Sequence, residues 1–202
     1  EQLRHRPWIE VEAGIRANGN VMVQGSDVAI GGVISYAGTK NVGSKVVSEG
    51  VVQSAAPVTP GFTWTVADFA PGARFSTEPG YVSHSGNWSV NGAARGIHYV
   101  SGNVTISASS LDLRGVTIVA TGTVTISGSE TRLEPARADL PTVLAGGGNC
   151  TTTAINVSGS DTRWDGVLAA PNGGAQINGS KVRGGTMLAA NVQISGSDIR
   201  IG

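Results

Sequence analysis

Carboxylates and arginines alternate in one part of the chain and are its best candidates for chemistry. Asp161, Arg163 and Asp165 follow one another at every second residue, and Asp112 and Arg114 occupy the corresponding phase of an earlier segment. Polysaccharide hydrolases and lyases use clustered carboxylates, with arginine or lysine as the base in lyases. Cleavage of an acidic glycan is therefore the chemistry to weigh for these residues.

The same arginines also recur at a fixed position of a repeating unit, which favours a structural role. If each unit is one coil of a stacked structure, residues of equal phase form a column on one face. Asp161 and Asp198 then serve as charge partners or turn residues, and no residue is assigned a catalytic role. The expected arginine column consists of Arg132, Arg163, Arg183 and Arg200.

The repeating unit is about 20 residues long, a period typical of solenoids. It is clearest in the segments 157–163, 177–183 and 194–200, each of which has a β-branched residue, a Gly-Ser turn, two further residues and an arginine. A second apolar run follows in the same phase, as in Gly166–Asn172 and Thr186–Asn191. We recognise about eight units, and each must bury its apolar face against its neighbours.

Runs such as Val104-Thr105-Ile106 and Val124-Thr125-Ile126 alternate apolar and polar residues, which indicates short strands. Gly-Ser and Asn-Gly pairs between the runs suit tight corners. An antiparallel sandwich is the alternative, but its successive strands would not need to resemble each other. The sequence therefore predicts an all-β fold, a single-stranded parallel β-helix of about eight to ten coils, expected to be right-handed.

We expect one β-solenoid domain over residues 1–202, interrupted by two insertions at 57–89 and 136–153. The first insertion is rich in proline and aromatic residues and is predicted to fold as a loop or cap on the flank of the solenoid. Its Phe62, Trp64 and Trp88 are candidates for a glycan or partner surface.

Composition argues against several classes of function. Charged residues make up 14% of the chain, and Lys+Arg equals Asp+Glu at 14 each, so no nucleic-acid partner is expected. The three histidines are scattered, Cys150 is the only cysteine, and no cofactor or metal motif is present. The many Gly, Ser, Thr and Asn residues favour an exported protein, extracellular or on the cell surface, and no membrane segment is evident.

Two stretches resemble a known family. Gly96–Ser107 and Gly166–Gly173, with the closing Ile194-Ser195-Gly196-Ser197, are similar to the C-terminal β-solenoid domain of bacterial pilus-assembly proteins of the PilX and Tad type. The coils from Gly166 to Gly202 also resemble bactofilins, which polymerise end to end. The resemblance implies a non-enzymatic structural protein of the cell surface, with self-association or other pilus and filament subunits as its partners.

The last residues reinforce this expectation, because the sequence stops in strand phase. Asp198, Ile199, Arg200 and Ile201 are predicted to form a bare self-assembly edge for a second copy or for the segment Trp8–Val11. A surface adhesin that binds glycans through the aromatic insertion is the alternative function. Ice binding is less favoured from the sequence, because a regular Thr-x-Thr ladder is not sustained along the chain.

Overall fold

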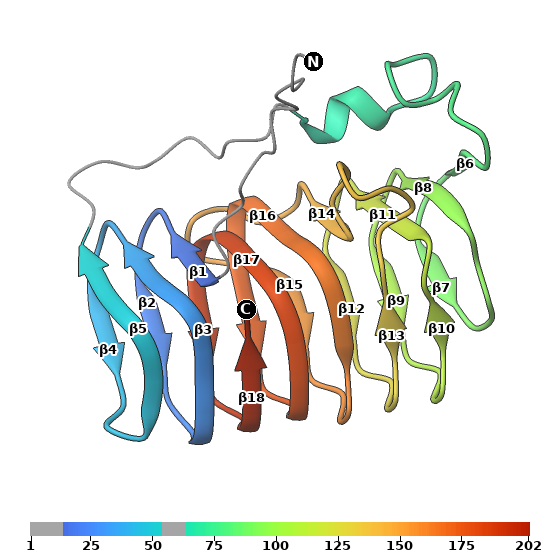
Figure 1. Ribbon diagram of the computed structural model, residues 1–202. Coiled ribbons are helices and arrows are strands. Elements are labelled where there is room, and N and C mark those ends of the chain that lie inside the picture. Colours follow the sequence, from blue (N-terminus) through green and yellow to red (C-terminus); the bar gives the residue numbers. More distant parts are fainter. Residues whose placement is uncertain (1–13, 54–63) are drawn as a thin grey trace, which may run out of the picture.

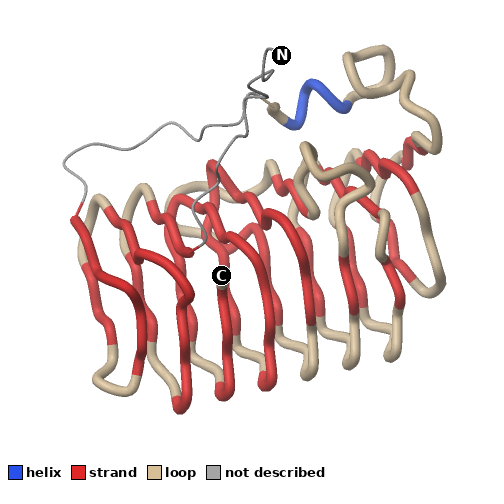
Figure 2. The backbone as a smooth tube through the Cα atoms, in the orientation of Figure 1, coloured by secondary structure: helices blue, strands red, loops and turns tan. Residues whose placement is uncertain are grey.

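Residues 14–53 and 64–202 are described by the computed structural model, and they form an all-β parallel solenoid of about nine turns. All strand pairs are parallel, so residues of equal phase in successive coils lie side by side. Figures 1 and 2 show the coils stacked into a rod, with each coil passing through up to three faces. The predicted fold class is confirmed.

The first face is called the uncharged face because its strands and their flanking residues carry almost no ionisable side chains. It consists of β7 (Trp88–Val90), β9 (Val104–Ile106), β12 (Val124–Ile126), β15 (Thr153–Val157), the last residues of β16 (Arg163–Ile177) and β17 (Ser180–Ile194), then β2 (Val21–Val23) and β4 (Lys40–Val42).

The second face is called the charged face. It consists of β10 (Asp112–Leu113), β13 (Arg132–Leu133), the first residues of β16 and β17, then β18 (Ser197–Ile201) and the first residues of β3 (Ser26–Tyr36) and β5 (Val46–Gln53).

The third face is called the covered face, because part of it lies beneath another segment of the chain. It consists of β6 (Val82–His84), β8 (Gly96–Val100), β11 (Val116–Ala120), β14 (Val143–Ala145), the middle of β16 and β17, then β1 (Gly14–Ala17) and the ends of β3 and β5.

The core lies inside the coils and follows from the alternation read in the sequence. In β9 and β12, the two apolar residues of each Val-Thr-Ile run are buried, while the threonine between them faces outward. Successive coils repeat the pattern, so one continuous core runs along the rod.

Glycines line the corner between the uncharged and the charged face because the backbones of neighbouring coils approach closely there. A Cβ on Gly179 would overlap the carbonyl oxygen of Gly159, and the same holds along the whole column. The residue two positions after each of these glycines has a left-handed backbone, as in Asp161 and Asp198, with φ of 51° and 50°. The column contains Gly25, Gly196, Gly179, Gly159 and Gly128.

The order of the coils along the rod differs from their order in the sequence. β1 pairs with β17 on one side and with β3 on the other, and β18 pairs with both β17 and β3. Figure 1 shows the C-terminal strand in the middle of the rod, between β17 and β3. Both outer coils of the rod, β4–β5 and β6–β7, therefore come from internal parts of the sequence.

This arrangement corrects the prediction of a bare edge at the C-terminus. Ile199 and Ile201 are 0% and 2% exposed, and Ile199 is in register with Val28 of the adjacent coil. The covering strand is Ser26–Ile30 of the same chain. The alternative docking segment, Trp8–Val11, lies outside the described residues.

An ion pair joins the two sequence-distant coils at this junction, and its removal should have a small, salt-dependent effect. Arg200 Nη2 lies 2.8 Å from Asp27 Oδ1 on the surface. We expect Asp27→Asn, which tolerates the same left-handed backbone, to lower the free energy of unfolding by less than about 1 kcal/mol. Urea denaturation at low and high salt measures this, and a difference between wild type and variant that does not shrink in high salt would contradict it.

Residues 64–81 lie against the covered face and include the short 3-10 helix η1 (Val66–Phe69). Phe69 and Phe75 are buried there, with ring centroids 4.4 Å apart, and they pack with Tyr99 and Val119. The segment is also held by an ion pair of 2.9 Å between Glu78 and Arg137. The predicted insertion 57–89 thus contains two parts, because residues 82–90 carry β6 and β7 of the outer coil.

The second predicted insertion, 136–153, also contributes to the solenoid. It holds β14, whose Val143 and Leu144 are in register with Leu168 and Ala169 of β16. Leu140 packs into the cluster beneath residues 64–81.

Candidate functional site

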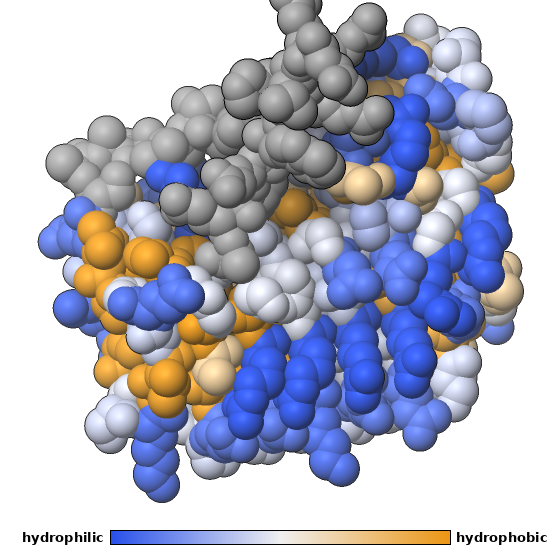
Figure 3. All heavy atoms as spheres, viewed as in Figure 1, coloured by the Kyte–Doolittle hydropathy of each residue, from blue (hydrophilic) through white to orange (hydrophobic). Residues whose placement is uncertain are grey.

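The charged face carries the arginine column in the arrangement expected from the repeat. Arg132 is in register with Arg163, Arg163 with Arg183, and Arg183 with Arg200. Figure 3 shows rows of hydrophilic side chains over these strands, with hydrophobic ones over β3 and β5.

Acidic side chains neutralise much of this column. Arg183 Nη2 donates to both carboxylate oxygens of Asp198 at 3.0 and 3.1 Å, and Arg200 bonds to Asp27. The hydrogen bonds from Arg183 hold the pKa of the Asp198 carboxyl below its usual value. Three arginines of the column, Arg163, Arg183 and Arg200, are thus in ion pairs, which reduces the attraction of the charged face for a charged polymer.

The candidate catalytic residues belong to the same pattern of ion pairs. Arg163 lies 3.5 Å from Asp161, and Arg114 binds Asp112 with both Nε and Nη2, at 3.0 and 2.7 Å. The register places Asp112 beside Arg132, so it aligns with the arginine column and not with Asp161. Asp165 is exposed, and its backbone carbonyl accepts a hydrogen bond from Thr142.

Hydrogen bonds from Arg114 lower the pKa of the Asp112 carboxyl far below its ordinary value. A general acid needs the opposite shift, because it must stay protonated near neutral pH. Asp112 is thus an ion-pair partner in this geometry.

Trp64 and Trp88, two of the three aromatic residues predicted as a ligand surface, pack against different clusters. Trp64 packs against the buried cluster of the covered face, and its Nε1 donates to the Asp139 carbonyl at 3.2 Å. Trp88 packs against the solenoid core at the outer coil. Phe62 lies outside the described residues.

Two of the three histidines meet, which the sequence analysis missed. His84 and His98 come from neighbouring coils, with His84 Nε2 3.0 Å from His98 Nδ1. Within residues 14–53 and 64–202, no group of three or more His, Cys, Asp and Glu side chains is arranged to hold a metal ion. Cys150 is a free, exposed cysteine.

The uncharged face carries a regular array of side chains at the outward positions of its strands, with the Oδ1 atom of Asn156 buried. Its middle column follows the register of eight strands, one residue from each. In spatial order, these strands and their flanking residues run from 87–91 in the first coil to 39–43 in the last. Lys40 is the one charged side chain among them. The middle column consists of Ser89, Thr105, Thr125, Asn156, Gln176, Gln193, Met22 and Asn41.

Amide and hydroxyl side chains link the coils along one edge of this face. Asn103 Oδ1 accepts hydrogen bonds from the backbone N–H and the hydroxyl of Thr123, at 2.8 and 3.2 Å. Asn20 binds Thr39 in the same way at 2.8 and 2.9 Å, and Asn87 Oδ1 accepts from the Asn103 N–H at 2.9 Å. These bonds fix the relative positions of neighbouring coils and keep the face rigid.

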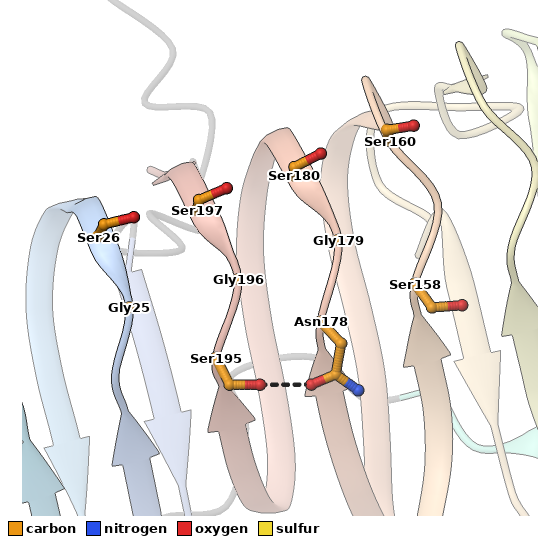
Figure 4. A pocket seen from close by; sticks show the side chains of 10 residues that line it. All are labelled: Gly25, Ser26, Ser158, Ser160, Asn178, Gly179, Ser180, Ser195, Gly196 and Ser197. Carbon is orange, nitrogen blue, oxygen red and sulfur yellow. Dashed lines mark hydrogen bonds between the residues drawn. The ribbon is translucent and has the colours of Figure 1, made fainter.

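The other edge is the corner with the glycine column, where two rows of small polar side chains flank glycine backbone. Figure 4 shows Ser26, Ser197, Ser180 and Ser160 in one row, and Ser195 bonded to Asn178 in the other. The hollow between them is lined by polar groups. Two further hollows are also open to solvent. One lies on the charged face beside Asp112 and Arg132, and the other lies on the uncharged face, where Met22, Gln176 and Gln193 line it together with residues 150–153.

No helix in the described ranges is long and apolar enough to cross a membrane. No family model and no curated protein matches the chain.

Two solved structures are similar to the whole chain at low sequence identity. One is titled an ice-binding protein DUF3494 domain from Shewanella frigidimarina, with 15% identity, a TM-score of 0.36 and coverage of 93% of this chain and 91% of the other. The second is titled a glycosylated ice-binding protein from an Arctic yeast, with 13% identity, a TM-score of 0.32 and coverage of 97% and 95%.

Neither match is a pilus-assembly domain or a bactofilin, so the predicted resemblance to those families is wrong. The pilus and filament function inferred from it is corrected with it, as is the alternative of a glycan-binding adhesin.

Proposed function

We propose that this protein binds ice through its uncharged face and has no catalytic role. The observation that carries the proposal is the array of uncharged polar side chains repeated over successive coils. Coils stack at about 4.8 Å, so eight strands present a surface roughly 34 Å long. Ice is an uncharged, repeating lattice of hydrogen-bonding groups, and a repeating surface can contact it at many points.

The chemistry of the face supports this ligand over others. Charged side chains would have to give up strongly bound water at an ice surface, and the face lacks them except for Lys40. Protein interfaces are enriched in aromatic residues, methionine and arginine. Of these types, the middle column contains only Met22.

Rigidity supports it as well, because an ordered surface loses little conformational entropy on binding. Thr105 and Thr125 have restricted χ1 angles, and the asparagine bonds tie their coils together. The mixed middle column explains why the sequence does not favour ice binding, since Ser, Asn, Gln and Met take the place of threonine in the other coils. An exported location is proposed together with this function.

Ice-crystal growth tests the proposal. We expect the wild-type protein to show thermal hysteresis and to change the shape of a growing crystal, while a panel of acidic polysaccharides is neither bound nor cleaved. Ice growth that is identical with the protein and with an equal concentration of serum albumin would contradict ice binding.

A further inference from the structure

The outer coil at one end of the rod has an unusual interior. β6 pairs with β8 and β7 pairs with β9, and no described strand lies on their other side. His84 and Trp88 are in register with Val100 and Val104, and His98 is in register with Ile118. Three ring side chains thus occupy inward positions that aliphatic residues fill in the following coils.

These rings form one layered plate. The imidazole of His84 stacks on the indole of Trp88 with centroids 4.4 Å apart and planes 17° apart. His98 stacks on the same indole at 4.6 Å and 3°, and the two imidazoles lie 18° from coplanar. Two side-by-side imidazoles therefore rest on one indole and cover the end of the apolar core.

Hydrogen bonds assign the protons within the plate. A backbone carbonyl can only accept, so His98 Nε2, which lies 3.0 Å from the Arg95 carbonyl, carries a hydrogen. In neutral His98, Nδ1 is then a bare acceptor, and His84 Nε2 must donate to it across 3.0 Å. A proton added to His84 Nδ1 keeps this bond. A second proton, on His98 Nδ1, places two N–H groups and two positive charges face to face.

Burial also disfavours protonation of the two imidazoles. His98 is 7% exposed, and desolvation is the main cause that lowers the pKa of both imidazoles below the ordinary value. The hydrogen bond to the Arg95 carbonyl raises the pKa of His98, and the charge of a protonated His84 lowers it; burial is the larger effect, so the pKa stays below its ordinary value. The Arg95 guanidinium bonds to the Ala94 carbonyl and is exposed, and desolvation raises the pKa of Tyr81, so that its phenol is uncharged near neutral pH.

We propose that the His84–His98–Trp88 plate is a proton-operated cap, closed when both imidazoles are neutral and opened when the pair takes up protons. Opening releases the β6–β7 coil and exposes the edges of β8 and β9, while the remaining coils stay folded. The cap does not rest on the proposed ice binding, although its opening would also displace Ser89, which β7 contributes to the middle column.

The direction of the pH dependence follows from linkage. Because the folded pKa values lie below the unfolded value of about 6.5, the open coil binds more protons than the closed one. The stability of the cap is fully present above about pH 6.5 and falls as the pH drops from there towards the folded pKa values.

Hydrogen exchange followed by mass spectrometry on the full chain tests the cap. After correction for intrinsic rates, protection of residues 82–90 should fall below pH 6.5 by up to ~10-fold per pH unit for each proton taken up on opening. Protection of 124–133, inside the rod, should not change. Equal corrected protection of 82–90 at pH 7.5 and 5 would overturn the proposal.

The double variant His84→Gln/His98→Gln separates protonation from other effects of acid. Glutamine can donate to the Arg95 carbonyl and accept a hydrogen bond, but it does not titrate. The variant should lose the pH dependence, and His5→Gln should retain it. If the double variant does not fold, NMR titration of the wild-type imidazoles decides, since pKa values at or above 6.5 for both histidines would overturn the proposal.

Discussion

Gly179→Ala is expected to lower the free energy of unfolding by about 3 kcal/mol or more, one of the largest effects of any single methyl group in this chain. The new Cβ would overlap the backbone carbonyl oxygen of Gly159 in the next coil. A flexible side chain could move aside, but a carbonyl in the stack cannot do so without separating two coils. Because the column is continuous, a displacement at one coil strains its neighbours as well.

Gly92→Ala is the matched control, because a Cβ there meets no atom within 4 Å and its backbone is not left-handed. The control should be neutral or stabilise slightly, by up to about 1 kcal/mol, through the unfolded state. Urea denaturation followed by circular dichroism gives both values. Equal unfolding midpoints for the two variants would mean that the coils are not packed as closely as described.

Thr125→Arg is expected to remove most of the ice-binding activity while leaving the fold intact. Thr125 lies in the middle column of the uncharged face, between Thr105 and Asn156. A long, charged side chain would hold the ice surface away from the neighbouring coils and would have to lose its own hydration. We expect adsorption to ice to fall by ~10-fold or more, a loss of at least about 1.4 kcal/mol.

Ala29→Arg introduces the same side chain at an outward position of the charged face, where it extends the arginine column beside Arg200. This control should keep wild-type activity. If both variants lose activity equally, or if neither does, the uncharged face is not the binding surface. Melting temperatures close to wild type for both proteins are needed for the comparison.

Much of the solenoid could be predicted from the sequence because its determinants are local. The Val-x-Ile alternation, the Gly-Ser corner and the arginine at a fixed distance from that corner occur within single units. Aligning the units therefore predicts the charged face and its arginine column. The position of Asp112 is predicted wrongly, because its coil has Ala108 in place of the corner glycine and its Asp-x-Arg pattern suggests the phase of Asp161.

The order of the coils could not be predicted in the same way. Stacking surfaces of similar coils are nearly equivalent, so no local pattern shows that Ser197–Ile201 lies beside Ser26–Ile30. The sequence predicts the outer coil as part of the aromatic insertion, because aromatic and proline residues cluster from Pro57 to Trp88. The His84–His98 contact depends on that coil and was missed with it.

The uncharged face cannot be recognised in the sequence from a single motif. A Thr-x-Thr ladder is not sustained, because Asn156 follows Thr125 in the middle column. The property that unites the face is the absence of charge over many coils, and this appears only when residues are sorted by face.

Two-colour adsorption to a single ice crystal tests the central claim most directly. Wild-type protein and Thr125→Arg, labelled with different dyes and mixed in equal amounts, are presented to a growing crystal. The proposed function predicts that the wild-type dye accumulates on defined crystal planes and that the variant is left in solution. Equal distribution of the two dyes, or no accumulation of the wild type on the crystal, would contradict it.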